Sequence, residues 1–158
     1  MILRRTSALV LGLALVGPIV SVTTADPAGA CSCVGFTDES ALARSDAVFT
    51  GRLVDVRHAK EVHTSLDPAT WVFAVDRVYK GAVRKRQEIV TAISGASCGL
   101  ETTGPGRLLV FAVGDHNVGL GPQPSRAQYA ANLCGGTRLL TDGGVPADFG
   151  RGHPPKRR

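Results

Sequence analysis

Hydrophobic and polar residues alternate along most of the chain in short stretches, a pattern that is typical of β-strands. The clearest stretch runs from Trp71 to Tyr79 and stops at Lys80-Gly81, where glycine supplies a turn. One face of this stretch carries Trp71, Phe73 and Val75, and the other carries Val72, Ala74 and Asp76. We therefore predict that it is a strand.

The same pattern predicts strands before and after this stretch. Asp46 to Val56 is the first of them, and Gly51 within it permits a bend or bulge. Its predicted faces are Val48, Thr50, Val54 and Val56 on one side and Phe49 and Leu53 on the other. The later strands are Glu88 to Ile93, the apolar run Arg107 to Val113, and the two ends of Tyr129 to Leu140, on either side of Gly135-Gly136. Gly114 to Ser125 is predicted to be a Gly/Pro-rich loop.

One short helix is predicted, from Asp38 to Ser45. Thr37 is a candidate N-cap, and Asp38 and Glu39 suit the positive end of the helix dipole. Five or six short strands, one helix and no regular alternation of strands with helices favour a mainly β fold. The expected architecture is a small antiparallel barrel, closed or nearly closed.

The first thirty residues carry the three parts of an export signal. Arg4 and Arg5 form a positive start, Ala8 to Val20 is apolar, and Thr23 to Ala30 is small and polar and ends in a signal-peptidase site. The apolar part is broken by glycine and proline and is shorter than the ~20 residues that span a bilayer. We expect residues 1–30 to be a signal peptide that is cleaved after Ala30, so that the secreted chain begins with Cys31.

Two alternatives concern this leader. Acylation of Cys31 would make the chain a lipoprotein, but the apolar run ends at Val20, well before Cys31, and three cysteines would then be left that cannot all pair. Arg4-Arg5 could also belong to a twin-arginine signal, although the residues around it match that pattern poorly. The export route stays open.

Cleavage after residue 30 of 158 leaves 128 residues, enough for one domain with one core. Loss of Arg4, Arg5 and Asp26 lowers the net charge from +5 to +4, and residues 143–158 carry +3 of it. This last segment is rich in Gly, Pro and Arg and poor in apolar residues. We therefore predict a domain over residues 31–142 and a disordered basic tail over residues 143–158.

The distribution of charge also limits the expected partners. The domain itself is close to neutral and has no basic stripe with interleaved aromatic residues, so nucleic acid is not expected as a partner. The basic tail is expected to make at most a weak contact with an anionic cell surface. We expect a monomer.

All four cysteines, Cys31, Cys33, Cys98 and Cys134, survive the cleavage. An even number in an exported chain indicates two disulfides. A bond between Cys31 and Cys33 would need a strained ring, so each should reach a distant partner, and the sequence does not say which. A zinc site with four cysteine ligands is the alternative, but C-x-C with two isolated cysteines lacks the paired C-x-x-C knuckles of such sites.

Several short motifs follow one another over most of Cys31 to Leu140. They are Cys31-Ser32-Cys33 at the mature terminus, Ser45-Asp46-Ala47-Val48-Phe49, Val78-Tyr79-Lys80-Gly81, Ser97-Cys98-Gly99, Leu108-Leu109-Val110-Phe111 and Leu133-Cys134. In this order and combination they resemble the netrin-type module of tissue inhibitors of metalloproteinases, in a form similar to small secreted bacterial relatives. The resemblance implies an OB-type barrel of five to six strands with one or two short helices, stapled by the disulfides Cys31–Cys98 and Cys33–Cys134.

The resemblance also implies a function, inhibition of a secreted zinc metalloprotease. The α-amine and carbonyl oxygen of the mature Cys31 would chelate the protease zinc at the position that otherwise holds water. Ser32 would enter the specificity pocket, and the flanking ridge would consist of Cys33, Val34, Ala96 and Ser97. No cofactor and no intrinsic metal is expected.

The chain departs from the family pattern at three points. Ser32 stands where the animal inhibitors usually have threonine, a third disulfide is missing, and this sequence lacks their second domain. Netrin-type modules also occur in proteins that inhibit nothing. The alternative is therefore an extracellular or cell-envelope protein-binding module without inhibitory activity.

We expect no enzymatic activity. His58 and His63 flank Glu61, but their spacing is not that of H-E-x-x-H, and they belong to a predicted hairpin loop. Cys98 and His116 could be drawn as nucleophile and base, yet a disulfide at Cys98 is the better interpretation, and no third orienting residue is evident.

Overall fold

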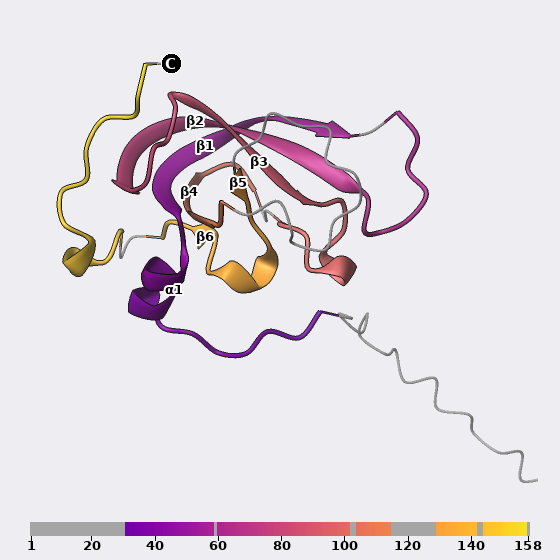
Figure 1. The fold of residues 1–158 in the computed structure, drawn as a ribbon, viewed down its shortest axis with the longest axis horizontal. Coiled ribbons are helices and arrows are strands. Elements are labelled where there is room, and N and C mark those ends of the chain that lie inside the picture. Colours follow the sequence, from indigo (N-terminus) through magenta and orange to yellow (C-terminus); the bar gives the residue numbers. More distant parts are fainter. Residues whose placement is uncertain (1–30, 59, 102–103, 115–128, 142–143, 158) are drawn as a thin grey trace, which may run out of the picture.

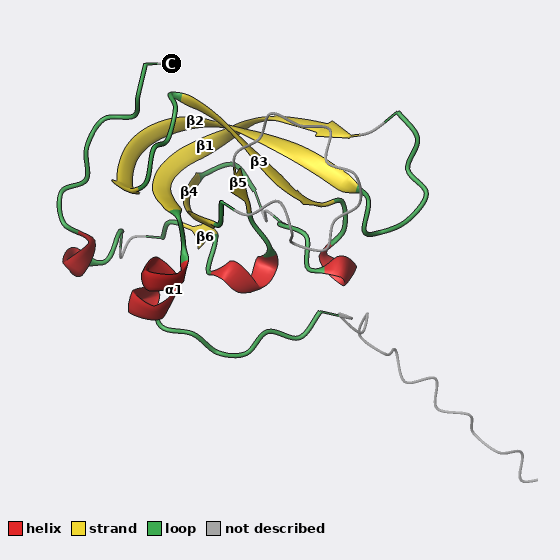
Figure 2. Cartoon of the chain, in the orientation of Figure 1, coloured by secondary structure: helices red, strands yellow, loops and turns green. Residues whose placement is uncertain are grey.

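The computed structural model describes residues 31–58, 60–101, 104–114, 129–141 and 144–157. These residues form a strongly curved sheet with one short α-helix beside it (Figures 1 and 2). The strands are β1 (Ala47–His58), β2 (Pro68–Lys80), β3 (Arg86–Ala92), β4 (Arg107–Ala112), β5 (Tyr129–Ala130) and β6 (Arg138–Leu139). The α-helix is α1 (Asp38–Arg44), and three single-turn 3-10 helices are η1 (Gly95–Ser97), η2 (Leu133–Gly135) and η3 (Ala147–Phe149).

The sheet curls into a nearly closed barrel. Its strand order is β5-β3-β2-β1-β4-β6, and each pair of the described strands is antiparallel except β3 with β5. Val113, just after β4, and Ala130 of β5 exchange two backbone hydrogen bonds of 2.9 Å. Because β5 thereby contacts both β3 and the end of β4, it joins the two sides of the sheet. The predicted mainly β, barrel-type fold is confirmed, with a parallel β3–β5 pair that the antiparallel prediction did not include.

The predicted elements lie close to their expected positions, and local chemistry explains their bounds. The Thr37 hydroxyl accepts a hydrogen bond from the Ser40 nitrogen, and the Ser40 hydroxyl accepts one from the Thr37 nitrogen, which caps α1. Gly51 sits at a register shift between β1 and β2, where a Cβ would strike the carbonyl oxygen of Ala74. Gly81 ends β2 with φ of +82°. The predicted signal peptide, and the predicted Gly/Pro loop from residue 115 onward, lie outside the described residues.

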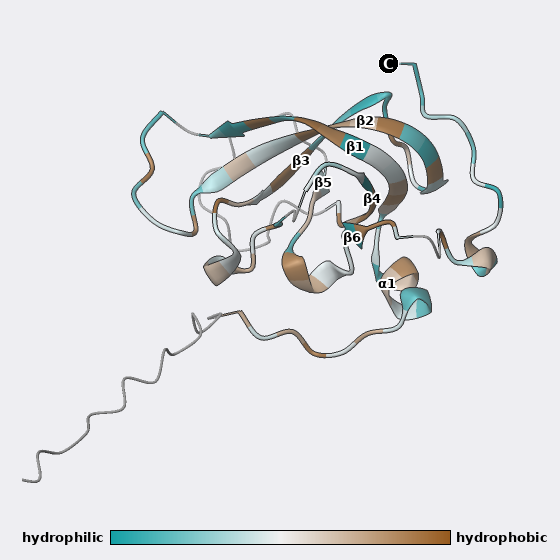
Figure 3. Cartoon of the chain, turned by 180° about the vertical axis from the view of Figure 1, so that it is seen from behind, coloured by the Kyte–Doolittle hydropathy of each residue, from teal (hydrophilic) through white to brown (hydrophobic). Residues whose placement is uncertain are grey.

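Two hydrophobic clusters lie on the two faces of the sheet. Inside the barrel, Phe49 and Phe73 are fully buried and meet edge to face with ring centroids 5.6 Å apart. On the outer face, a smaller cluster joins α1, the sheet and the C-terminal segment, and its buried members are Ala41, Val48, Leu109, Phe111 and Phe149. Residues 47–51 of β1 are therefore buried on both faces, whereas Val54 and Val56 are exposed. Figure 3 shows hydrophobic stretches along β1 and β2.

The C-terminal segment corrects the prediction of a disordered tail over residues 143–158. Val78 of β2 and His153 exchange two backbone hydrogen bonds, of 2.9 and 2.8 Å. Further on, the Lys156 nitrogen donates to the Val83 carbonyl, and the Lys156 carbonyl accepts from the Lys85 nitrogen. The described residues 144–157 thus belong to the domain.

Phe149 is the physical reason for this difference. It is buried between the rings of Tyr79 and Phe111, with centroids at 6.2 and 6.0 Å. The composition of the segment is that of a disordered chain, but one buried aromatic ring and a row of backbone hydrogen bonds suffice to hold it on the sheet.

Candidate functional site

The residues singled out from the sequence lie on two segments, Cys31–Val34 and η1 with Cys98 after it, which a disulfide joins. Cys31 is bonded to Cys98 and Cys33 to Cys134, with Cα–Cα distances of 5.2 and 5.1 Å. These are the pairs that the resemblance to metalloproteinase inhibitors implies. The two bonds lie side by side, since the Sγ of Cys31 is 3.6 Å from the Sγ of Cys134.

The disulfides bear on the zinc-site alternative. The sulfurs of Cys31, Cys33 and Cys134 lie within 4.8 Å of one another, which is close enough for metal ligands. A cysteine in a disulfide, however, has no thiolate to offer a metal, and the structure contains no free cysteine among the residues it describes. In the structure the cluster is therefore a double staple of two adjacent disulfides.

The turn η1 positions Cys98 to receive Cys31. The Ser94 hydroxyl caps the turn by accepting a 3.2 Å hydrogen bond from the Ala96 nitrogen. Cys98 follows with φ of +60°, a left-handed conformation that is rare outside glycine. Its carbonyl oxygen accepts a 2.8 Å bond from the nitrogen of Leu133, the first residue of η2, and this bond brings Cys134 next to Cys98.

The segment before α1 is held by these disulfides and not by backbone pairing. Within the described residues, the backbone nitrogen and carbonyl oxygen of Cys31 take part in no hydrogen bond. Ser32 and Cys33 are exposed, and Val34 has 89% of its surface exposed, more than any other large hydrophobic residue described. Among the described residues, the segment therefore presents unpaired backbone groups and an unpacked apolar side chain at the surface.

Two further exposed segments are η1, which the Cys31–Cys98 bond ties to the amino-terminal segment, and the loop between β1 and β2. Ala96 is exposed, and the hydroxyl of Ser97 is hydrogen-bonded to the hydroxyl of Ser65 at 2.6 Å. In the same loop, Val62 and Leu66 have about half of their surface exposed, at 49% and 50%. The predicted ridge thus has a neighbour that sequence reasoning missed, because no motif near Ser65 signals a contact with η1.

The histidine-based alternatives do not form a catalytic set in the part of the chain that the structure describes. The Nε2 of His63 lies 3.7 Å from a carboxylate oxygen of Glu61, and both side chains are exposed in the loop. Cys98 is held in a disulfide, and His116 lies outside the described residues. The absence of enzymatic activity stays a prediction.

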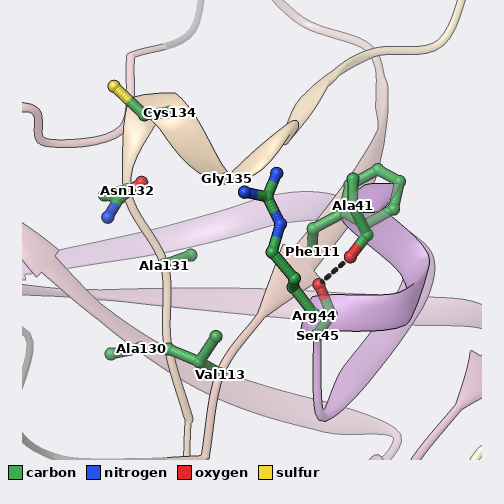
Figure 4. A pocket seen from close by; sticks show the side chains of 10 residues that line it. All are labelled: Ala41, Arg44, Ser45, Phe111, Val113, Ala130, Ala131, Asn132, Cys134 and Gly135. Atoms are coloured by element: carbon green, nitrogen blue, oxygen red, sulfur yellow. Dashed lines mark hydrogen bonds between the residues drawn. The ribbon is translucent and has the colours of Figure 1, made fainter. Parts of the chain in front are cut away.

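A cavity of about 230 Å³ lies between α1, the end of β4 and the segment from β5 to η2. Figure 4 shows the Arg44 side chain over it and the Ser45 hydroxyl donating to the carbonyl of Ala41, at 2.8 Å. The described lining is mostly apolar, and Arg44 is its one ionisable group apart from the bonded Cys134. Arg44 has no ionisable acid or base beside it among the described lining residues, and the Ser45 hydroxyl is engaged by the Ala41 carbonyl, so no catalytic set is evident there.

The chain matches no protein-family model, and no curated protein matches it. The two disulfides indicate an oxidising environment. Among the described residues, no helix is long and apolar enough to cross a membrane.

Proposed function

We propose that the protein is a secreted netrin-type inhibitor of zinc metalloproteases, in which the mature Cys31 chelates the zinc of the protease. The observation that carries the proposal is the state of the Cys31 backbone. Its nitrogen and oxygen are unpaired within the described residues, in a segment that two adjacent disulfides fix to the barrel.

The chemistry requires removal of the leader, because only a terminal Cys31 has an α-amine. That nitrogen and the Cys31 carbonyl oxygen close a five-membered ring with the metal, at the coordination position that a protease leaves for water. The amine must be neutral to bind. Since the pKa of an α-amino group is about 8, loss of its proton costs little at neutral pH, and the metal favours it.

The geometry of the segment supports the remaining roles. The disulfides hold Cys31 and Cys33 before a protease arrives, which lowers the ordering cost of binding. Ser32 is exposed between them and is assigned to the specificity pocket of the protease. Cys33, Val34, Ala96 and Ser97 are assigned to the ridge beside it. Because serine fills a deep pocket poorly, the choice of target depends on the depth of that pocket.

The test is a titration of a panel of secreted zinc endopeptidases with protein that begins at Cys31. We expect inhibition of at least one member at micromolar concentration, and loss of that inhibition when one alanine precedes Cys31 or when the amine is carbamylated. The melting temperature should not change, because all four sulfurs can still pair.

Ser32→Gly is the matched control for these terminal changes. It should weaken inhibition to a degree that depends on the target, since the pocket contact is lost while chelation persists. Inhibition that survives the added alanine would overturn the chelation mechanism. No inhibition of any panel member would favour the alternative, a protein-binding module without inhibitory activity.

A further inference from the structure

A second surface arises where the C-terminal segment crosses the turn between β2 and β3. Lys156 lies beside Arg84 in a parallel β-bridge, with hydrogen bonds of 2.8 Å to the Val83 carbonyl and 3.0 Å from the Lys85 nitrogen. This pairing brings Lys156 and Arg157 next to the run Arg84-Lys85-Arg86. Figure 1 shows this region on the opposite side of the molecule from the loop between β1 and β2, and Figure 3 shows that the end of the C-terminal segment is hydrophilic.

The cations border a groove of about 670 Å³. Its lining residues are the cations Arg84, Lys85, Arg86 and Arg157 together with residues 74–76 of β2. A smaller hollow of about 150 Å³ shares Arg84 and Arg86 with it. All five basic side chains in this region, including that of Lys156, belong to exposed residues.

The positive charge of the groove is not offset by nearby acids of the described chain. Asp76 lines the groove, but its carboxylate is engaged by Arg107, with 2.9 Å between Nε and Oδ2, and more distantly by Arg52. The carboxylate of Glu88 is likewise engaged, in a salt bridge with Arg57. Between the described residues, no salt bridge involves the five cations. Backbone hydrogen bonds hold these like charges together, and an anionic ligand would relieve their repulsion.

We propose that this basic groove binds a linear anionic polysaccharide. Arginine predominates among its cations, and the planar guanidinium groups of Arg84, Arg86 and Arg157 suit bidentate contacts with sulfate, phosphate or carboxylate groups. An open groove fits an extended polymer better than a small enclosed ligand.

Two other anionic partners fit the groove less well. Single-stranded nucleic acid is held by bases stacked on aromatic rings, and none of the described residues that line the groove is aromatic. Binding to a membrane surface combines basic with apolar side chains, but the exposed large hydrophobic residues described belong to the amino-terminal segment, β1 and the loop after it. Polysaccharide binding would be an activity additional to the proposed inhibition, because a bound polysaccharide would anchor the molecule while Cys31 stays free.

The experiment measures binding of a fluorescently labelled heparin octasaccharide at fixed salt. The double variant Arg84→Gln with Arg86→Gln should raise the Kd about tenfold. The matched control, Arg44→Gln with Lys60→Gln, removes the same charge from α1 and the loop after β1, and should change the Kd by less than about twofold. The charge-preserving double variant Arg84→Lys with Arg86→Lys should lie between the two, because lysine keeps the charge but not the bidentate contact.

Three outcomes would overturn the proposal. The first is no binding of the octasaccharide by the unmodified protein. The second is an equal loss of affinity in the groove variant and the matched control, which would show that affinity depends on net charge alone. The third is binding of an oligothymidine, or of vesicles rich in anionic lipid, that is as tight as that of the octasaccharide and equally dependent on Arg84 and Arg86.

Discussion

At the scale of single residues, Asp67 organises the loop that lies beside η1. Its Oδ2 accepts hydrogen bonds from the backbone nitrogens of Thr64, at 2.9 Å, and His63, at 2.5 Å. Both bonds stabilise the ionised form of the carboxyl group and hold the pKa of Asp67 below its usual range, and the bond from Thr64 has the larger effect. Ser65, which contacts Ser97, sits inside the turn that Asp67 closes.

This shift gives a pH dependence of known sign. A carboxyl group with a lowered folded pKa stabilises the protein above its unfolded pKa of about 3.9, and the contribution is lost as the pH falls through the folded pKa. Asp67→Asn should therefore lower the melting temperature more at pH 7 than at pH 2. Thermal unfolding of both proteins across this range measures the difference, and a difference that does not vary with pH would contradict the assigned role.

Residues with local roles are the ones that the sequence predicts well. Thr37 caps the helix that follows it, and Gly51 and Gly81 satisfy steric needs of their own strands, so short patterns identify all three. Ser65 and Ser97 are 32 positions apart, and their contact depends on how the barrel folds. No pattern near either residue predicts it.

At the scale of elements, the C-terminal segment shows where composition is a poor guide. Composition gives the number of apolar residues but not whether one of them packs into a hydrophobic cluster. Phe149 packs into the cluster that α1 and the outer face of the sheet form. The strands β1 to β4 were predicted correctly because each is long enough for many positions to indicate a strand, by alternation in β1 to β3 and by a continuous apolar run in β4.

Phe149→Ala should consequently destabilise the whole domain. Truncation of a core phenylalanine costs about 3–5 kcal/mol, and a ring at the edge of a cluster should cost somewhat less, about 2–4 kcal/mol. Arg151→Ala, at an exposed position of the same segment, should stay within about 0.5 kcal/mol of the unmodified protein. Denaturant unfolding of both variants measures the contrast. Equal stability of the two would show that the segment does not pack on the sheet.

At the scale of the whole molecule, the sequence establishes the number of disulfides better than their pairing. An even number of cysteines after a predicted export signal indicates two bonds, but the bonded cysteines lie 67 and 101 positions apart, and only the resemblance to an inhibitor family implied the pairs. The parallel pairing of β3 with β5 was not predicted from the sequence either, because barrel closure depends on the complete path of the chain. Long-range geometry of this kind leaves no local pattern.

The pairing predicts both a covalent map and a loss of stability. Non-reducing peptide mapping, with backbone fragmentation between Cys31 and Cys33, should link Cys31 to Cys98 and Cys33 to Cys134. Removing the second bond by Cys33→Ala with Cys134→Ala should cost up to about 4 kcal/mol in denaturant unfolding, because the bond closes a long loop. A fragment that links Cys33 to Cys98 would contradict the arrangement of the double staple.

Chelation of a protease zinc by Cys31 is the central claim about how the molecule acts, and it can be observed at the metal. The measurement is the visible absorption of a protease that the mature protein inhibits, with its catalytic zinc replaced by cobalt(II), whose bands respond to a change of ligands. One equivalent of protein beginning at Cys31 should shift these bands, as an amine nitrogen and a carbonyl oxygen replace water, and the alanine-extended protein should leave them unchanged. Full inhibition by the mature protein with unchanged cobalt bands would contradict chelation.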